Sequence, residues 1–339
     1  MENIFLSGAA ERVTDLEDDG KEKWYLPLFG VYHPKKKDNI RGVFDSSASY
    51  GGFCLNDVLL SGPTMTNSLL GVLLRFRKDH YAMTADIKQM FYRFLVNNEH
   101  RDFFCFFWFE DNDPKRPLCV YRMRVHVFGN KPSPAVATYG LRKTVENANA
   151  DIQEFVKESF YVDDALASRP TQDEAIFSLL KNTRKVLQDE GLIRLHKITS
   201  NDVEIMNQFP KEELDTTLKD IDIYDVLPTQ HSLGLSWDLN LDVFTLTAPC
   251  VDRAFTGRGL LSTMNSVFYP MGFVAPFTIS GKILLRKACS DGSAWDDPLP
   301  TTYCEEWNTW KSRLEQLHGF QVPRKYISKS LSLMKDINV

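Results

Sequence analysis

Two adjacent carboxylates, Asp163 and Asp164, are enclosed by short apolar runs within the segment Ser159 to Leu166. This pattern predicts a β-hairpin that carries the two acids at its tip. Adjacent acids repel one another when both are ionised, so a fold that keeps them in a water-poor groove generally needs a cation there. The segment is therefore a candidate metal site. An ordinary solvated turn is the alternative, since Asp is a favoured turn residue.

A third carboxylate, Asp86, lies near the end of the run Tyr81 to Ile87, which reads as a short buried strand. A large aromatic residue, Phe91, follows this acid by five positions. One acid at a strand end and two on a distant hairpin form the ligand set of paired Mg²⁺ ions, which clamp the attacking and leaving oxygens of a phosphoryl or nucleotidyl transfer. We therefore expect a reaction that uses a nucleotide and a primer.

Length and composition limit the class of protein. The chain has 339 residues, more than one hydrophobic core normally serves, so two or more subdomains are expected. No apolar run is long enough to span a bilayer and the N-terminus lacks a signal-peptide pattern, which predicts an intracellular protein with no membrane partner. The six cysteines are scattered without zinc-ligand spacing, so we expect them to be reduced and mostly buried.

The formal net charge of -5 is unfavourable for a nucleic-acid enzyme, because phosphate contacts need Lys and Arg. Local basic clusters can compensate for it. One cluster runs from Lys35 to Arg41, and a second contains Arg122 and Arg124. Each cluster is either a phosphate site or a solvated loop.

Periodicity and turn signals predict an α+β protein, in which an antiparallel sheet has helices on one face. A loose acidic arm (1–23) precedes the main section (24–247), and a mainly helical section (248–339) follows it. Besides the segments above, the pattern predicts a two-stranded hairpin across 103–128, a hairpin across 230–246, and helices at 135–149, 171–191, 257–266 and 276–288. A further helix is introduced by Pro63-Thr64, carries an apolar stripe over 69–76 and ends at Arg77-Lys78.

Three motifs occur in a fixed order: Ala85 to Phe91, Phe128-Gly129 with Ser133-Pro134, and Tyr161-Val162-Asp163-Asp164. In this order they resemble the motifs of a reverse transcriptase. Flanking segments resemble the Pao/BEL lineage of long-terminal-repeat retrotransposons: Gly30 to Pro34, Arg41 to Ala48, Leu55 to Pro63, Gly71 to Arg77 and Arg101 to Phe103. Two later stretches, Tyr269 to Pro276 and Trp295 to Pro300, resemble the region that follows the polymerase in that lineage. The ordered set favours a metal site over a solvated turn at Asp163-Asp164.

The resemblance implies a right-hand polymerase with palm and fingers, followed by a thumb-like or connection segment. Asp86 and Asp163 would hold two Mg²⁺ ions, with Mn²⁺ as an alternative metal. Asp164 would be a nearby third carboxylate, and the carbonyl of Ile87 a further ligand. Phe91 would lie beneath the incoming sugar, where its ring would collide with a ribose 2′-hydroxyl and so favour deoxynucleotides. A plain core position is the alternative for Phe91.

The resemblance also implies contacts to the incoming nucleotide. Arg41 matches the fingers residue that lies over the triphosphate, where its guanidinium can bind phosphate oxygens. Phe128 and Gly129 would pack beside the nucleotide. One of three consecutive lysines would assist Arg41, and these are Lys35, Lys36 and Lys37.

Two further sites follow from the same resemblance. Lys197 matches a lysine suited to protonating pyrophosphate, and a surface lysine is the alternative. Leu233, Gly234 and Trp237 resemble the primer grip, a hairpin that positions the primer terminus. Trp237 could instead be an anchor of the core.

The expected partners are an RNA or DNA template with its primer, deoxynucleotide triphosphates, and an oligomer or other polyprotein-derived chains. The expected location is a cytoplasmic retroelement particle with access to the nucleus. No protease, ribonuclease H or integrase is recognisable, which suggests a polyprotein fragment or a truncated copy. Two rivals remain open. One is an RNA-dependent RNA polymerase, which normally has an acid where Phe91 stands, and the other is a decayed or domesticated copy that binds nucleic acid without turnover.

Overall fold

The computed structural model describes residues 1–14, 22–33, 36–218, 227–246, 253–267, 269–289 and 294–326. Contacts divide the chain into two units, each built from separate stretches of sequence. The first unit comprises Met1–Asn67, Ile87–Asp163 and Leu180–Leu195, and the second comprises Ser68–Asp86, Asp164–Leu179 and His196–Val339. Lys35 and Cys250 lie outside the described residues, and the side chains of Lys36 and Lys37 are not described.

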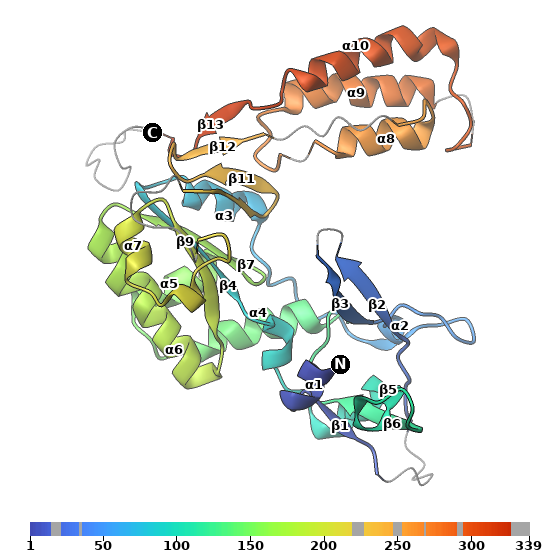
Figure 1. Ribbon diagram of the computed structural model, residues 1–339, viewed down its shortest axis with the longest axis vertical. Coiled ribbons are helices and arrows are strands. Elements are labelled where there is room, and N and C mark those ends of the chain that lie inside the picture. The colour runs from blue at the N-terminus through green and yellow to red at the C-terminus, as the bar shows by residue number, and fades with distance from the viewer. Residues whose placement is uncertain are drawn as a thin grey trace. The chain divides into compact units, whose positions relative to one another are not determined.

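The first unit contains an antiparallel sheet in the order β1-β6-β5 (Figure 1). Its strands are β1 (Ala10–Arg12), β5 (Cys105–Phe109) and β6 (Leu118–Met123). The predicted hairpin across 103–128 is confirmed, because β5 pairs with β6 from Cys105 opposite Arg122 to Phe109 opposite Leu118. A second hairpin joins β2 (Leu28–His33) to β3 (Lys36–Phe44).

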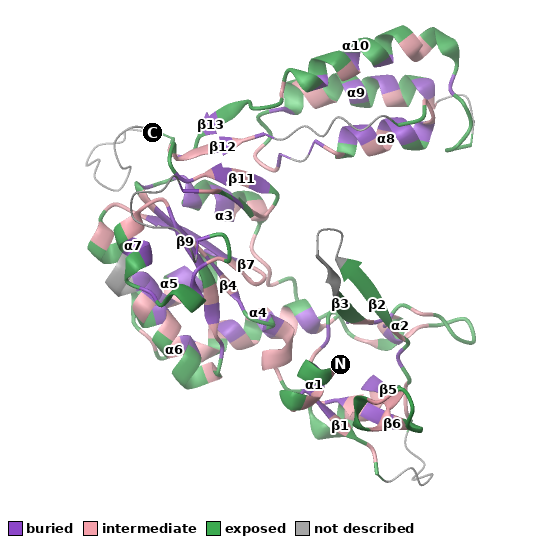
Figure 2. Cartoon of the chain, in the orientation of Figure 1, coloured by how far each residue is buried: buried purple, intermediate pink, exposed green. Residues whose placement is uncertain are grey.

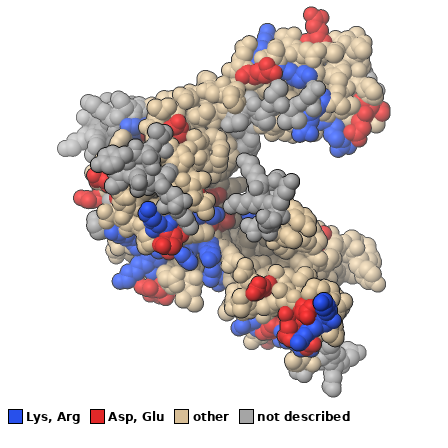
Figure 3. Space-filling model, in the orientation of Figure 1, with Lys and Arg blue, Asp and Glu red and all other residues tan. Residues whose placement is uncertain are grey.

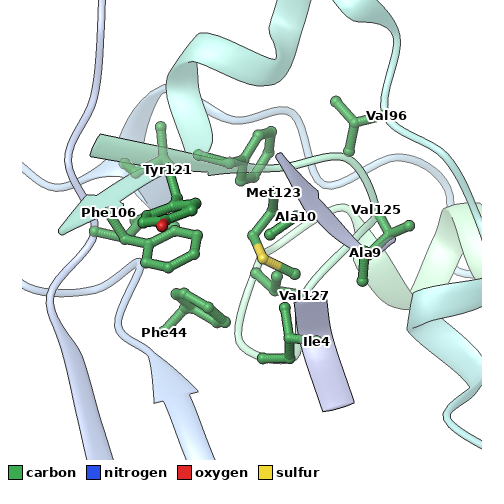
Figure 4. Packing of buried hydrophobic residues seen from close by; sticks show 13 residues of the cluster. Ile4, Ala9, Ala10, Phe44, Val96, Phe106, Tyr121, Met123, Val125 and Val127 are labelled. Atoms are coloured by element: carbon green, nitrogen blue, oxygen red, sulfur yellow. The ribbon is translucent and has the colours of Figure 1, made fainter. Parts of the chain in front are cut away.

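The N-terminal segment belongs to the core of this unit. Helix α1 (Glu2–Leu6) buries Ile4, and β1 pairs with β6. Figure 4 shows Ile4 beside a cluster that includes Phe106 and Met123. The ring of Phe106 lies 5.1 Å from that of Phe44 and 5.9 Å from that of Tyr121. The expectation of a loose arm is therefore wrong for residues 1–14, because a few apolar side chains in a polar stretch suffice to dock it.

Helices make up much of the remaining first unit. Where a single helix was expected over 135–149, the structure has α4 (Ser133–Thr144) and then α5 (Ala150–Glu158), which the sequence analysis missed. Helix α5 buries Ile152, Phe155 and Val156, the spacing of one helical face. The other elements are α2 (Leu55–Val58), η1 (Met90–Arg93), η2 (Asn98–Phe104), η3 (Glu110–Asn112), β7 (Phe160–Tyr161) and α6 (Asn182–Gly191).

The central sheet of the second unit contains β4 (Tyr81–Ile87) between β8 (Asp164–Arg169) and β9 (Leu195–Ser200). The predicted bounds of the 81–87 strand are confirmed. Helix α3 (Leu69–Phe76) begins at the cap Ser68, whose Oγ accepts from Gly71 N, and packs beside β8. The helix predicted over 171–191 is present as η4 (Glu174–Lys181) continued by α6, and shorter elements are α7 (Val203–Asn207) and η5 (Lys211–Glu213).

A second sheet in this unit has the order β10-β11-β12-β13. Its strands are β10 (Thr229–Ser232), β11 (Leu235–Asp238), β12 (Val243–Thr245) and β13 (Gln321–Pro323). Because β13 pairs with β12, the section after 247 completes a sheet that begins before it. The expected boundary near residue 247 therefore does not match the division of the structure.

Three helices pack together in the C-terminal section (Figure 1). The predicted helices at 257–266 and 276–288 are confirmed as α8 (Gly257–Asn265) and α9 (Ala275–Ala288). The third, α10 (Cys304–Glu315), follows η6 (Thr301–Tyr303) and was not predicted. Figure 2 shows buried and exposed residues alternating along α10, whose buried face carries Trp307, Trp310 and Leu314.

Two whole-chain expectations are tested by the described residues. The five cysteines among them are free thiols, but only Cys105 is buried and the other four are half-buried, so the expectation of mostly buried cysteines is wrong. No described helix combines the length and the apolarity needed to cross a bilayer.

Candidate active site

Asp86 and Asp164 face each other across the central sheet of the second unit. Strands β4 and β8 are antiparallel, and their register places Asp86 directly opposite Asp164. Residues directly opposite in such a ladder have Cβ atoms about 4.5–5.5 Å apart and project from the same face of the sheet. Both side chains belong to half-buried residues near strand ends. The register therefore brings together two of the three carboxylates that the sequence singled out.

The third carboxylate, Asp163, lies in the turn between β7 and β8. The carbonyl of Asp163 accepts a hydrogen bond from the backbone N–H of Ile87 at 2.9 Å. The residue before it, Val162, has a φ of 57°. A β-branched residue is rarely found in this left-handed region, so the turn that carries Asp163 is locally strained.

Two side chains of β9 hydrogen-bond to Asp86. Lys197 Nζ lies 2.7 Å from Asp86 Oδ2, and His196 Nε2 lies 3.0 Å from Oδ1. Consecutive strand residues normally point to opposite faces, but Lys197 has a φ of 51°, which breaks that alternation and allows both side chains to reach one carboxylate. His196 was not predicted from the sequence, although it directly precedes Lys197.

These contacts decide the charge of Asp86. Burial alone would raise its pKa, but the hydrogen bonds from His196 and Lys197 outweigh that effect and the pKa is lowered from its ordinary value. Asp86 is therefore ionised at neutral pH. Among the described residues, no three or more His, Cys, Asp or Glu side chains are grouped so that they could hold a metal ion.

The nucleotide-binding candidates lie in the first unit. Phe91, in η1, has its ring 6.0 Å from that of Phe128, which is 73% exposed. Gly129 has a φ of 99°, and its carbonyl accepts a hydrogen bond from Asn56 Nδ2 at 3.0 Å. Arg41 is exposed on β3, opposite Val31. The structure thus brings Phe91 and Phe128 together, and it places Arg41 on the neighbouring β2–β3 hairpin.

The predicted primer-grip residues form the β10–β11 hairpin of the second unit. Leu233 and Gly234 connect the two strands with φ values of 49° and 78°. Positive φ at both central residues is the signature of a two-residue hairpin turn. Gly234 is exposed, whereas Trp237 is buried and its ring meets that of Phe76 edge-on at 5.1 Å. Trp237 is therefore a core anchor, and the tip is formed by Leu233 and Gly234.

The second basic cluster of the sequence is neutralised by acids in the first unit. Arg122 pairs with Glu11 at 2.7 Å and with Asp102 at 2.6 Å, and Arg124 lies 3.4 Å from Glu11. Burial lowers the pKa of Arg122, but these hydrogen bonds outweigh it and raise that pKa overall. Acidic and basic side chains also lie side by side over α10 in the second unit (Figure 3).

Comparison with known proteins identifies the architecture. Residues 256–336 match the family described as the Pao retrotransposon-like RNaseH-like domain. No curated protein matches the sequence. A foamy viral protease-reverse transcriptase in complex with double-stranded DNA superposes with a TM-score of 0.60 and 16% identity, covering 92% of this chain and 46% of that one. The same kind of protein with an RNA/DNA hybrid gives a TM-score of 0.58, also at 16% identity, covering 94% of this chain and 36% of that one.

The fold is a mixed α/β fold similar to that of these two reverse transcriptase structures. It spans less than half the length of either foamy viral structure. The residues that match the Pao family include both later stretches that resembled the region after the polymerase, so that part of the resemblance is confirmed. The expectation that no ribonuclease H-like segment is present is corrected by this match. The described part of the matched segment contains α8, α9, α10 and β13. Because most of these elements are helices, the sequence was interpreted as a thumb-like or connection segment and not as a ribonuclease H-like one.

Proposed function

We propose that the chain is an RNA-directed DNA polymerase of a retroelement, which extends a primer with deoxynucleotides by nucleotidyl transfer. The observation that carries the proposal is the register of β4 and β8, which sets Asp86 opposite Asp164 within a reverse transcriptase fold. Asp163 precedes Asp164 directly in the chain, so three carboxylates are available near two strand ends. Two like charges held opposite one another need a neighbouring positive charge.

The donor set fits magnesium in its chemistry. Carboxylate oxygens are the ligands that Mg²⁺ prefers, and the carboxylate of Asp86 already accepts a hydrogen bond from the cationic Lys197. In the proposal Asp86, Asp163 and Asp164 would hold the ions, together with the carbonyl of Ile87; the three carboxylates would draw together on binding, since they are not grouped for a metal among the described residues. When bound, the ions would lower the pKa of the primer 3′-hydroxyl and steady the leaving pyrophosphate.

Two residues of β9 are assigned roles next to the carboxylates. His196 orients Asp86 through its hydrogen bond to Oδ1, and Lys197 keeps the same carboxylate ionised. The side chain of Lys197 is 47% exposed, so its ammonium can exchange the carboxylate for a phosphate oxygen at modest cost. This exchange would let Lys197 protonate the departing pyrophosphate, as the resemblance implies.

The first unit would receive the incoming nucleotide. Phe91 would select against the ribose 2′-hydroxyl, supported from the side by the ring of Phe128. Gly129 leaves room for the base or sugar, and Arg41 would bind the triphosphate. Leu233 and Gly234 would contact the primer terminus from the tip of the β10–β11 hairpin.

Nucleic acid is the expected partner. The two foamy viral proteins were solved with double-stranded DNA and with an RNA/DNA hybrid. For this chain we propose an RNA or DNA template with its primer. Because the net charge is -5, binding should depend on local basic groups and weaken with added salt.

Primer extension tests the proposal. The purified chain is mixed with an RNA template, an annealed DNA primer, deoxynucleotides and Mg²⁺, and product length is followed with time. We expect extension that requires Mg²⁺ and that falls by ~100-fold or more in Asp163→Asn. Asp296→Asn is the matched control, since that exposed carboxylate pairs only with Arg258 among the interactions described, and it should extend like the wild type.

Each alternative function predicts a different outcome of this assay. Equal inactivity of the wild type and Asp163→Asn rejects the polymerase, and salt-sensitive binding in the same samples then selects the non-catalytic copy. Faster extension with ribonucleotides than with deoxynucleotides selects an RNA polymerase instead.

A further inference from the structure

Arg324 is fully buried in the second unit. Its Nε donates to Asp242 Oδ1 at 2.7 Å, and its Nη2 donates to Asp242 Oδ2 at 2.9 Å. The backbones are also joined, because Arg324 N donates to the carbonyl of Asp242 at 2.9 Å. This is a bidentate arginine–carboxylate pair, the geometry in which the planar guanidinium binds a carboxylate most specifically. An arginine is almost never buried completely without such partners.

The same guanidinium reaches the base of the strand that carries Asp86. Its Nη1 donates to the carbonyl of Phe76 at 2.6 Å, and its Nη2 donates to the carbonyls of Asp79 at 2.9 Å and His80 at 2.8 Å. Phe76 is the last residue of α3, where carbonyls lack partners within the helix. His80 directly precedes β4, and Asp86 lies toward the other end of that strand.

Asp242 extends this connection to the β10–β11 hairpin. Its Oδ1 accepts a second hydrogen bond, from Trp237 Nε1 at 3.1 Å. Trp237 belongs to β11, whose other end leads into the hairpin tip at Leu233 and Gly234. The carboxylate of Asp242 therefore connects the hairpin to Arg324, and Arg324 connects the hairpin to the residues that directly precede β4.

A second arginine holds the segment that presents Arg324. Arg77 Nε donates to the carbonyl of Arg324 at 2.7 Å, and Arg77 Nη2 donates to that of Pro323 at 3.0 Å. The Arg77 guanidinium also lies 4.3 Å from the ring centre of Tyr326, in a cation–π contact. The position of Arg324 is thus fixed by its backbone as well as by its side chain.

We propose that Arg324 is a positioning residue for the primer terminus, an inference that rests on the proposed polymerase function. It fixes the β10–β11 hairpin relative to β4, and so sets the distance between the primer 3′-end and Asp86. Transfer requires reacting atoms within about 3.5 Å of one another, and a misplacement of about 1 Å can cost ~100-fold in rate. Polymerase chemistry would then depend on a residue of the C-terminal section that touches neither substrate nor metal.

The experiment uses the double variant Arg324→Met with Asp242→Asn. Neutralising both partners avoids leaving one unpaired charge buried, which by itself destabilises a protein strongly. The matched control is Arg258→Met, which removes an exposed arginine of the same section that pairs with Asp296 at 2.7 and 3.1 Å. Primer extension on an RNA template gives kcat and the KM for deoxynucleotide, and thermal unfolding is measured on the same samples.

In the folded double variant we expect kcat to fall by ~10-fold or more while the KM for deoxynucleotide changes little. Arg258→Met should match the wild type in both. A purely structural role predicts a loss no larger than the unfolded fraction at the assay temperature. A folded double variant with wild-type kcat therefore overturns the inference.

A cross-linking readout separates this inference from the polymerase proposal, because it needs no turnover. The probe is an RNA/DNA duplex whose primer ends in photoreactive 4-thiothymidine. The wild type should cross-link within 229–238, and the double variant should lose most of that product while binding the duplex. If the wild type cross-links there but does not extend the primer, the polymerase proposal fails, and loss of the cross-link in the double variant still tests whether Arg324 positions the hairpin on the duplex. An equal cross-link in the double variant, or none in the wild type, overturns the inference.

Discussion

Asp86 and Asp164 stand directly opposite one another on antiparallel strands, and Lys197 donates a hydrogen bond to the first of the two at 2.7 Å. The sheet thus holds two carboxylates at directly opposed positions, and one of them accepts from an ammonium group. A structure built this way is sensitive to any change that removes the positive charge. In the proposed polymerase these carboxylates would supply the oxygen donors for nucleotidyl transfer.

Replacing that ammonium should weaken the second unit. Lys197→Met leaves the two carboxylates opposed, so we expect the free energy of unfolding at neutral pH to fall by about 1 kcal/mol or less, because Lys197 is half exposed. Urea unfolding measures the change. Lys143→Met, which breaks an exposed pair with Glu146, is the control and should leave stability unaltered.

The hydrogen bond between Lys197 and Asp86 also predicts that the free energy of unfolding decreases at acid pH. The pKa of Asp86 is lowered in the folded protein, so its contribution is present above its ordinary value near 3.8 and is lost as pH falls through the lowered pKa. Lys197→Met should bring the pKa of Asp86 back up and shrink this loss. Urea unfolding of both proteins between pH 6 and roughly pH 3 measures this loss. An equal loss of unfolding free energy in the two proteins would contradict the assignment.

Phe91 should set sugar selectivity. In Phe91→Ala the space beneath the sugar opens, so incorporation of ribonucleotides relative to deoxynucleotides should rise by ~100-fold, the scale on which a pocket discriminates by fit. Single-nucleotide kcat/KM ratios measure this. Phe107→Ala, which removes an exposed ring stacked on Tyr25, is the control. Unchanged selectivity in Phe91→Ala would assign Phe91 to packing alone.

Two helical glycines should respond oppositely to alanine. A Cβ at Gly71 would meet nothing closer than 3.6 Å, so Gly71→Ala should stabilise by about 0.5–1 kcal/mol through helix propensity. A Cβ at Gly140 would lie 2.2 Å from the ring of Phe94, so Gly140→Ala should destabilise by about 1–3 kcal/mol despite the same propensity. Denaturant midpoints of the two variants test the contrast, and equal signs would refute it.

The strained turn beside Asp163 offers another test. Asn tolerates a positive φ better than a β-branched residue, so Val162→Asn should raise the free energy of unfolding by about 1 kcal/mol. If the strain helps to aim Asp163, primer extension should fall in the same variant. A more stable protein with undiminished extension would show that the strain has no catalytic role.

Local patterns predicted several elements well. The run 81–87 has a clear pattern of apolar residues and clear ends, and its predicted limits match those of β4. The two C-terminal helices α8 and α9 have strong periodicity and the structure reproduces them within a residue. Helix α5 was missed because the predicted helix was extended through Asn149, the residue that in fact begins the next one as its N-cap.

Contacts between distant segments could not be read from the sequence. His196 hydrogen-bonds to an acid 110 residues away, and nothing in its neighbours specifies that partner. Arg324 lies in a charged tail whose pattern suggests solvent exposure, yet tertiary contacts bury it completely. A lone histidine or arginine has many partners open to it, and only the register of the strands selects one.

The pairing of Arg324 also bears on how the protein reaches its folded state. Its hydrogen bonds to Phe76, Asp79 and His80 close loops of 248, 245 and 244 residues. Contacts of such high order are entropically costly to form and tend to form slowly. The strand that carries Asp86 therefore gains these hydrogen bonds only after residue 324 has been made. Until then the end of α3 keeps unsatisfied carbonyls, and the nascent chain should be most vulnerable to misfolding and proteolysis during that interval.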